Sequence, residues 1–169
     1  MSKKGTLKFY KKGGAAQLRL IPPRLNEKGF LEKEGAVLLE AAPGTGNGRD
    51  LSWDWSKKIV FAISFTDITN IFNGDTIDIF HQSEDTPKKL QIIPGQNSGF
   101  FLNLAEGKGD SRRQVKVSLT DGEWRVLRQT LMQMVPFLVG WEEDHEEIFG
   151  EIEALREEIR EFKNSYRRN

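Results

Sequence analysis

The stretch KLQIIPGQNSGFFLNL, from Lys89 to Leu104, combines an aromatic ring with a cation and two amides at positions that share one strand face. If it forms two strands around its proline-glycine turn, alternation places the aliphatic residues on one face and Lys89, Gln91, Phe101 and Asn103 on the other. A ring can stack on a flat π-system, an ammonium group can pair with an anion, and amides can hydrogen-bond polar edges. An alternative stays open, in which Phe101 packs against a second sheet or a neighbouring subunit.

A second cluster of the same residue types lies in TLKFYK and AAQLRLI, two predicted strands joined by a pair of glycines. Lys8, Tyr10 and Lys12 share one face of the first strand, Lys11 lies on the other, and Arg19 alternates with leucines on the second strand. A tyrosine flanked by lysines suits contact with both a base and a phosphate backbone. Ordinary solvated lysines are the competing interpretation.

Cations that follow phosphates, together with rings that stack on bases, are what the binding of an unpaired nucleic acid requires, and stacking tolerates any base sequence. Three further cations, Arg112, Arg113 and Lys116, lie near two glycines and could extend the basic surface. The candidate binding residues are therefore Lys8, Tyr10, Lys11, Lys12, Arg19, Lys88, Lys89, Gln91, Phe101, Asn103, Arg112, Arg113 and Lys116.

The formal net charge of zero conceals a segregated distribution of charge. Residues 1–33 carry nine Lys and Arg against two Asp and Glu, and residues 86–118 carry six against two. Residues 34–85 carry three against nine, and residues 142–169 carry five against ten. Because the two basic segments are also the predicted strands with exposed rings, a neutral chain can present a basic surface to a polyanion.

Several other functional classes find little support in the sequence. The absence of cysteine excludes disulfides and thiol catalysis, and no apolar run or secretory leader predicts a membrane partner. The loop GTGNGR lacks the lysine of a phosphate-binding P-loop, so we interpret it as a linker. His81 near Asp75 and Asp78, and His145 within EEDHEE, are weak metal-site candidates. We expect no enzyme activity, no metal or other cofactor, and no small-molecule substrate.

The elements that would position these residues follow from the hydrophobic patterns. Four strands are expected in the first third of the chain, in TLKFYK, AAQLRLI, GFLEK and GAVLLEAA. The segment WDWSKKIVFAISFTDITNIF is ambiguous, and we favour a helix capped by Asp54 or Ser52. Strands then resume in TIDIFHQ, in the two halves of the Lys89–Leu104 stretch and in RQVKVSL.

A second helix is predicted more clearly. Thr120 and Glu123 have the spacing of a capping box, and apolar residues recur every three or four positions from Trp124 to Leu138. Pro136 should kink its last turn and a glycine should end it. Residues 142–169 continue with an apolar seam at helical spacing, which fits either a coiled coil or a helix packed on its own domain.

Five segments resemble the Whirly family of single-stranded DNA-binding proteins in order and spacing. They are YKKGGAAQLRLIPP, EGAVLLEAAP, WDWSKKIVFAISFTDI, KLQIIPGQNSGFFLNL and LTDGEWRVLRQTLMQMVPFLVGW. The resemblance implies an α+β fold of two four-stranded antiparallel sheets, each followed by a helix (ββββα repeated twice), assembled as a tetramer through the helices. It also implies that single strands lie across the sheets with little sequence preference.

Two features depart from the family pattern. Gly14 stands where the family has the second lysine of its N-terminal hairpin, and the tail beyond Trp141 has no counterpart. The missing organellar transit sequence suggests a bacterial or phage relative and a cytoplasmic location. We therefore expect a nucleic-acid-binding domain over residues 1–141 and an acidic helical or coiled-coil tail over 142–169.

The expected function is sequence-independent binding of single-stranded DNA in replication, recombination or repair. One alternative is an RNA-binding or annealing protein of the same fold, because no residue type distinguishes a 2′-hydroxyl from its absence. Another is a structural assembly protein that acts through its C-terminal helix.

Overall fold

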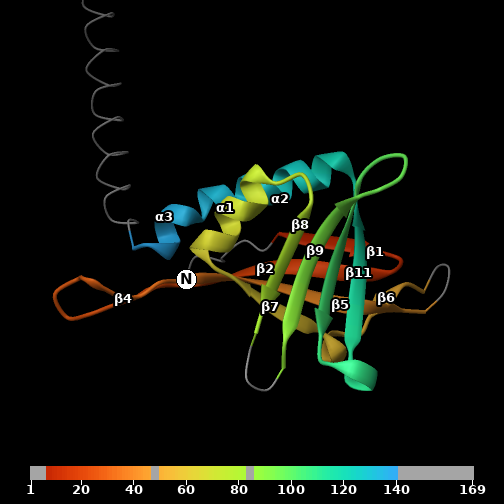
Figure 1. Cartoon of the computed structure of the whole chain (residues 1–169), viewed down its shortest axis with the longest axis horizontal. Helices are drawn as coiled ribbons and strands as arrows, with labels where there is room; N and C mark the ends of the chain where they lie inside the picture. Colours follow the sequence, from red (N-terminus) through yellow and green to blue (C-terminus); the bar gives the residue numbers. More distant parts are fainter. Residues whose placement is uncertain (1–6, 47–49, 83–85, 141–169) are drawn as a thin grey trace, which may run out of the picture.

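The computed structural model describes residues 7–46, 50–82 and 86–140. Two antiparallel β-sheets pack face to face, and the strands of one cross those of the other (Figure 1). The first sheet contains β1 (Lys8–Lys11), β2 (Gly14–Ile21), β5 (Ala36–Thr45), β6 (Ser52–Trp53) and β7 (Ile59–Ile63). Its central strand β5 pairs with β2 on one side and with β6 and β7 on the other.

The second sheet is a four-stranded meander in the order β11-β10-β9-β8. Its strands are β8 (Ile77–His81), β9 (Lys88–Pro94), β10 (Phe100–Glu106) and β11 (Arg113–Leu119). Alternate residues of β8, β9 and β11 are buried, as expected for a sheet with one face on the core, whereas β10 also buries its outward-facing Asn103 and Ala105. Leu90 and Ile92 therefore pair with Leu104 and Leu102 on the inner face, which confirms the predicted facing of the Lys89–Leu104 stretch.

The ambiguous segment from Trp53 to Phe72 divides into three elements, and the prediction of one helix was wrong. A short 3-10 turn, η1 (Trp55–Lys57), is capped by Asp54, and β7 follows it. Helix α1 (Phe65–Asn73) begins only at Ser64, whose hydroxyl accepts from the backbone N–H of Asp67 while the Asp67 carboxylate accepts from Ser64. Pairing with β5 satisfies the backbone of the β-branched run, so tertiary contact decides against helix there.

The second helix confirms its predicted start. Helix α2 (Asp121–Gln133) opens with the capping box of Thr120 and Glu123, and its buried face carries Trp124, Leu127 and Leu131. Pro136 lies in a separate short turn, α3 (Val135–Leu138), after which the chain reaches Gly140 with a φ of 77°. Helices α1 and α2 contact each other beyond one end of the second sheet (Figure 1).

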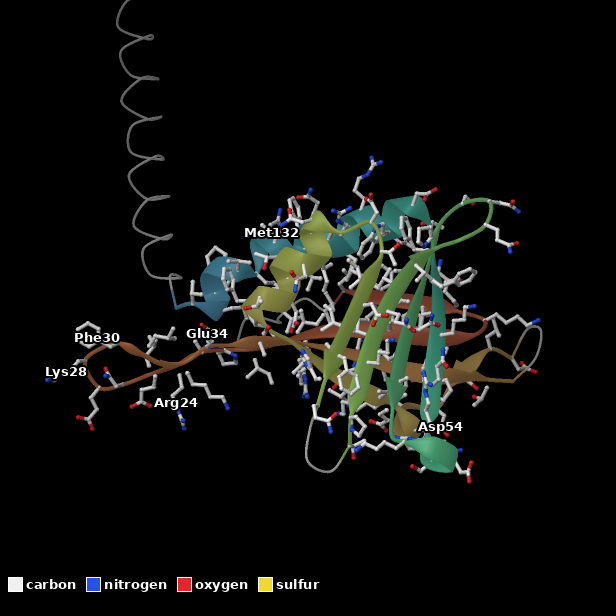
Figure 2. The ribbon with its side chains drawn as sticks, in the orientation of Figure 1. Arg24, Lys28, Phe30, Glu34, Asp54 and Met132 are labelled. Atoms are coloured by element: carbon white, nitrogen blue, oxygen red, sulfur yellow. The ribbon has the colours of Figure 1, made fainter. Side chains whose placement is uncertain are left out.

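The predicted third strand, GFLEK, does not join the first sheet. Its residues form β4 (Leu31–Lys33), which pairs only with β3 (Arg24–Leu25) in an arm that projects from the sheets (Figures 1 and 2). Phe30 lies at the tip of this arm and is 67% exposed. The strand that completes the first sheet is β7 instead, so the arrangement is α+β with antiparallel sheets but not the predicted ββββα repeat strand for strand.

Among the described residues, no helix is both long and apolar enough to cross a bilayer. The predicted tail over residues 142–169 and its boundary at Trp141 lie outside the described residues.

Candidate nucleic-acid interface

The outer face of the second sheet gathers several of the predicted residues. Register places Gln91 between Asp78 and Asn103, and Asn103 between Gln91 and Lys116, so these four form one row across the sheet. Phe101 is two residues from Asn103 on the same strand face, and the Lys116 ammonium lies 4.0 Å from the centroid of its ring. The ring is partly exposed and is not packed between the two sheets. The face therefore offers a ring, a cation and amides side by side.

One carboxylate on this face already holds two of the candidate ligands. Asp78 accepts a hydrogen bond from the Lys89 ammonium at 3.0 Å and one from the Gln91 side-chain amide at 3.0 Å. The hydrogen bond from Lys89 is the main reason that the pKa of Asp78 lies below its ordinary value. A phosphate that approaches Lys89 must therefore compete with this carboxylate.

Asn103 is unusual for an outer-face residue because it is only 8% exposed. Its Oδ1 atom is buried and has no hydrogen-bond partner among the described residues. A buried acceptor without a partner is costly, and native structures usually supply one. The orphaned acceptor belongs to the same row of residues as Gln91 and Lys116.

The first sheet has a comparable outer face. Register aligns Lys8 with Gln17 and Glu40, and Tyr10 is the next outward residue on β1. The Tyr10 ring lies 4.7 Å from that of Trp53, whose indole N–H donates to the Lys11 carbonyl oxygen at 2.9 Å. Tyr10 remains 47% exposed, so the pair forms an accessible aromatic surface beside Lys8.

Glu40 is buried on that same outer face. The Lys58 ammonium donates to it at 2.9 Å, Gln17 donates to its other oxygen, and Arg19 lies 3.4 Å away. Burial opposes ionisation of this carboxyl, but the hydrogen bonds from Lys58 and Gln17 and the charges of Lys58 and Arg19 together hold its pKa below the ordinary value. The Arg19 side chain is still 61% exposed and can contact another anion.

Three predicted cations lie elsewhere. Lys88 and Arg113 occupy inward-facing strand positions at one end of the second sheet, where both pair with Glu106. The Lys88 ammonium also donates to the Val60 carbonyl oxygen at 2.7 Å and so bridges the two sheets. Lys11 points toward α2 and pairs with Glu123 at 2.8 Å. The structure separates these three side chains from the two outer faces because strand alternation and the turns direct them inward.

Lys12 lies in the turn between β1 and β2, and Arg112 lies in the loop before β11, both exposed. One exposed residue with suitable chemistry, Phe80, was missed in the sequence. Phe80 is 56% exposed on the edge strand β8, in register with Lys89. Alternation within TIDIFHQ, where Ile77 and Ile79 are buried, was the signal that would have found it.

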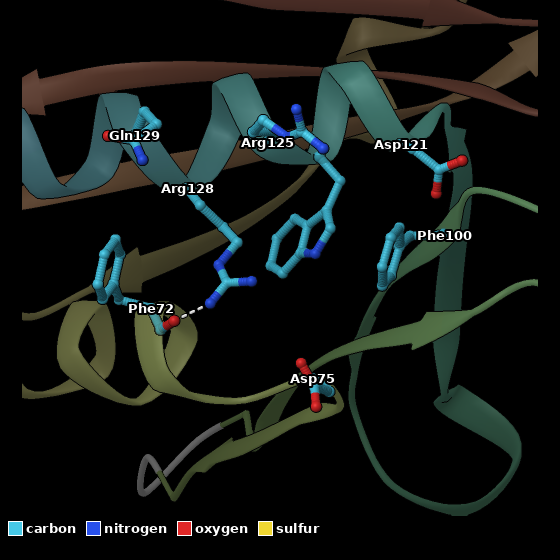
Figure 3. A pocket seen from close by; sticks show the side chains of 8 residues that line it. Phe72, Asp75, Phe100, Asp121, Arg125, Arg128 and Gln129 are labelled. Carbon is cyan, nitrogen blue, oxygen red and sulfur yellow. Dashed lines mark hydrogen bonds between the residues drawn. The ribbon is translucent and has the colours of Figure 1, made fainter.

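A hollow of about 560 Å³ lies between α1, α2 and the start of β10 (Figure 3). Arg128 crosses it, donates to the Phe72 carbonyl oxygen, and lies 5.4 Å from the ring of Trp124. The Trp124 ring also lies 5.2 Å from that of Phe100. These contacts join the two helices to the second sheet, so the residues have a packing role.

Of the two histidines considered as metal ligands, His145 lies outside the described residues, and His81 has a different partner. His81 Nε2 lies 3.2 Å from a carboxylate oxygen of Asp67, and its ring stacks on Phe61 at 4.3 Å. Within the described ranges, no three His, Cys, Asp or Glu side chains form a group that would hold a metal ion.

The chain is an α+β protein whose two crossed antiparallel sheets carry rings and cations on their outer faces, and comparison with known proteins identifies its family. The family model described as "Whirly transcription factor" matches residues 9–130. The chain therefore belongs to the Whirly family.

Relatives in sequence agree with this family assignment. The chain is 31% identical over 124 residues to "Single-stranded DNA-binding protein WHY1, chloroplastic" of Solanum tuberosum, a match that covers 66% of this chain and 44% of the relative. It is 23% identical over 124 residues to "Single-stranded DNA-binding protein WHY2, mitochondrial" of Arabidopsis thaliana, covering 66% of this chain and 51% of the relative. The match thus spans about half the length of these curated relatives.

Solved structures share the fold. The crystal structure of WHY3 from Arabidopsis thaliana superposes with a TM-score of 0.74 at 28% identity, covering 85% of this chain and 94% of that one. The structure of WHY1 from the same plant gives 0.75 at 26% identity, covering 86% and 91%.

These relatives correct two expectations. Their names place them in chloroplasts or mitochondria, so the predicted cytoplasmic location was wrong. They are also plant proteins, and a bacterial or phage origin finds no support in them.

Proposed function

We propose that this protein binds single-stranded DNA with little sequence preference, without enzymatic activity. The observation that carries the proposal is the row of Lys116, Asn103 and Gln91 on the outer face of the second sheet, with Phe101 directly beside it. A ring that can stack on any base, among cations that can contact phosphates, fits an unpaired strand and not the closed base pairs of a duplex. The relatives' name, single-stranded DNA-binding protein, supports the same ligand.

The outer face of the first sheet extends the proposed surface. Tyr10 supplies a second accessible ring, and Lys8, Lys12 and Arg19 supply cations around it. Arg112 adds a cation at the end of the second sheet. Lys11, Lys88 and Arg113 are the weakest members of the predicted set because each pairs with a carboxylate away from the two outer faces.

We further propose that the chain forms a homotetramer through its helices and acts on single strands exposed during DNA replication, recombination or repair. The exposed apolar side chains of Val126 on α2 and Phe137 on α3, which are 50% and 37% accessible, support a helical interface. Burying such side chains against other copies would remove apolar surface from water.

The test is a fluorescence-anisotropy titration of the full chain against a labelled oligothymidine, an oligouridine and a duplex, at about 50 mM and about 200 mM salt. We expect the oligothymidine to bind more tightly than the duplex, with affinity that falls as salt rises. Equal or tighter binding of the oligouridine would instead favour an RNA ligand. The proposal is overturned if the protein binds none of these three nucleic acids at low salt.

A further inference from the structure

A hollow of about 340 Å³ opens on the outer side of the second sheet, at the end opposite Phe101 along β10. Its floor is Ala105, and Phe80 on β8 and Lys89 on β9 stand in register with that residue. The loop that follows β10 supplies Lys108 and Arg112 on the other side. The volume is within the range of small-ligand sites.

The floor of the hollow exists because a small residue occupies an outward position. Ala105 is flanked by Lys89 on one strand and Gln114 on the other, and it is only 7% exposed beneath them. The Phe80 ring is 56% exposed, although it lies on an edge strand where water would otherwise favour a polar side chain. The exposed ring of Phe80, the small Ala105 at the floor and the nearby cations together suit a ligand that has a flat ring joined to a negatively charged group.

We infer that this hollow binds one nucleotide of the single strand, with the base stacked on Phe80 and the adjoining phosphate held by Lys108 and Arg112. The inference rests on the proposed function and assigns it a second stacking residue. No ion pair joins Lys108 or Arg112 to any other residue in the described parts of the chain. Both cations are exposed, so a phosphate can reach them without first displacing a carboxylate of the described residues.

Phe80 and Phe101 are too far apart to hold the same base. Phe101 lies four residues from Ala105 along β10, and Phe80 lies two strands away from Ala105. With about 3.3 Å per residue and about 4.8 Å between strands, the backbone positions of Phe80 and Phe101 are about 16 Å apart. Each ring therefore binds its own base, and the strand runs diagonally across the sheet between them.

The experiment compares Phe80→Ala, Phe80→Leu and Phe80→Trp in the full chain by titration of a labelled oligothymidine. Loss of one stacked base should weaken binding by about fivefold to 150-fold in Phe80→Ala. Phe80→Leu should weaken it to a similar degree, whereas Phe80→Trp should retain it because a larger ring still stacks. The matched control is Phe30→Ala, which removes an exposed ring from the distant arm and should leave affinity unchanged.

Two further measurements test the phosphate contact and the separation of the rings. The double change Lys108→Gln and Arg112→Gln should reduce the slope of log affinity against log salt by about two, one for each lost contact. In the double variant, the effects of Phe80→Ala and Phe101→Ala on the logarithm of affinity should add, because the two sites share no partner. Melting temperatures confirm that each variant is folded.

The outcomes separate this inference from the proposed function. If the unaltered protein binds no single strand, the proposed function fails. If it binds, but Phe80→Ala matches Phe30→Ala, the hollow is not a nucleotide site and only this inference is overturned. Full retention of affinity by Phe80→Leu would likewise overturn the assignment of Phe80 as a stacking ring.

Discussion

The ammonium group of Lys116 lies 4.0 Å from the centroid of the Phe101 ring, on adjacent strands of the second sheet. In the free protein the cation covers a face of the ring on which a base would stack. A bound strand can take both groups at once, because the base replaces the ammonium on the ring and the ammonium moves to a phosphate.

Phe101→Ala should therefore weaken single-strand binding. We expect a loss of about fivefold to 150-fold, the effect of removing one stacked base. Ile93, the cross-strand partner of Phe101, is 36% exposed on the same face, so Ile93→Ala is a matched control that removes apolar area but no ring. Fluorescence anisotropy measures both, and equal losses would argue against stacking on Phe101.

Asp78→Asn should strengthen binding. The change removes a negative charge from the proposed surface and weakens the hold on Lys89 and Gln91. Because exposed ion pairs are weak, we expect a gain of about twofold to fivefold at low salt, and less as salt rises. Glu27→Gln on the projecting arm removes the same charge elsewhere and should leave affinity unchanged. A decrease in affinity for Asp78→Asn would show that the carboxylate positions Lys89 instead of competing for it.

Glu40 should contribute a stability that depends on pH. Its pKa is lowered in the folded protein, so the folded state favours the ionised form and the contribution is fully present above the unfolded pKa. The contribution is lost as pH falls below about 4.5 and through the folded pKa. Urea unfolding at a series of pH values should show this loss in the unaltered protein.

Glu40→Gln removes this titrating group, and it should lower the free energy of unfolding at pH 7 by about 1–3 kcal/mol because Lys58 loses its buried partner. It should also flatten the acid limb of the stability curve. Glu34→Gln, at an exposed position on the arm side of β5, is the control. An acid limb in Glu40→Gln as steep as that of the unaltered protein would contradict the assignment.

Val126→Glu should dissociate the proposed tetramer. Val126 is 50% exposed on α2, on the side away from the buried Trp124 and Leu127, and a charge there would be desolvated in a helical interface. Light scattering measures the mass in solution, and Gln133→Glu on the same helix introduces the same charge as a control. A monomeric unaltered protein would refute the tetramer. Monomers obtained only on removal of residues 142–169 would instead identify the tail as the oligomerising element.

Local sequence patterns determined much of this protein. The alternation from Lys89 to Leu104 predicted which side chains face the core, because period-2 burial is a property of any half-buried strand. The capping box at Thr120 predicted the start of α2, because its hydrogen bonds join neighbours in sequence. The same rule, applied at Ser64 instead of Asp54, would have separated β7 from α1.

Tertiary structure decided what depends on distant partners. Pairing with β5 made Ile59–Ile63 a strand, and the absence of such a partner left Leu31–Lys33 in the arm. Glu123 pairs with Lys11, and Glu106 with Lys88, across separations of 112 and 18 residues. Asp78 and Glu106 pair with Lys89 and Arg113 on neighbouring strands, where sequence spacing alone does not show which charges will meet. Local hydrogen bonds and strand alternation depend on residues that are adjacent in sequence, whereas an exposed charge meets its partner only when strands and helices have assembled.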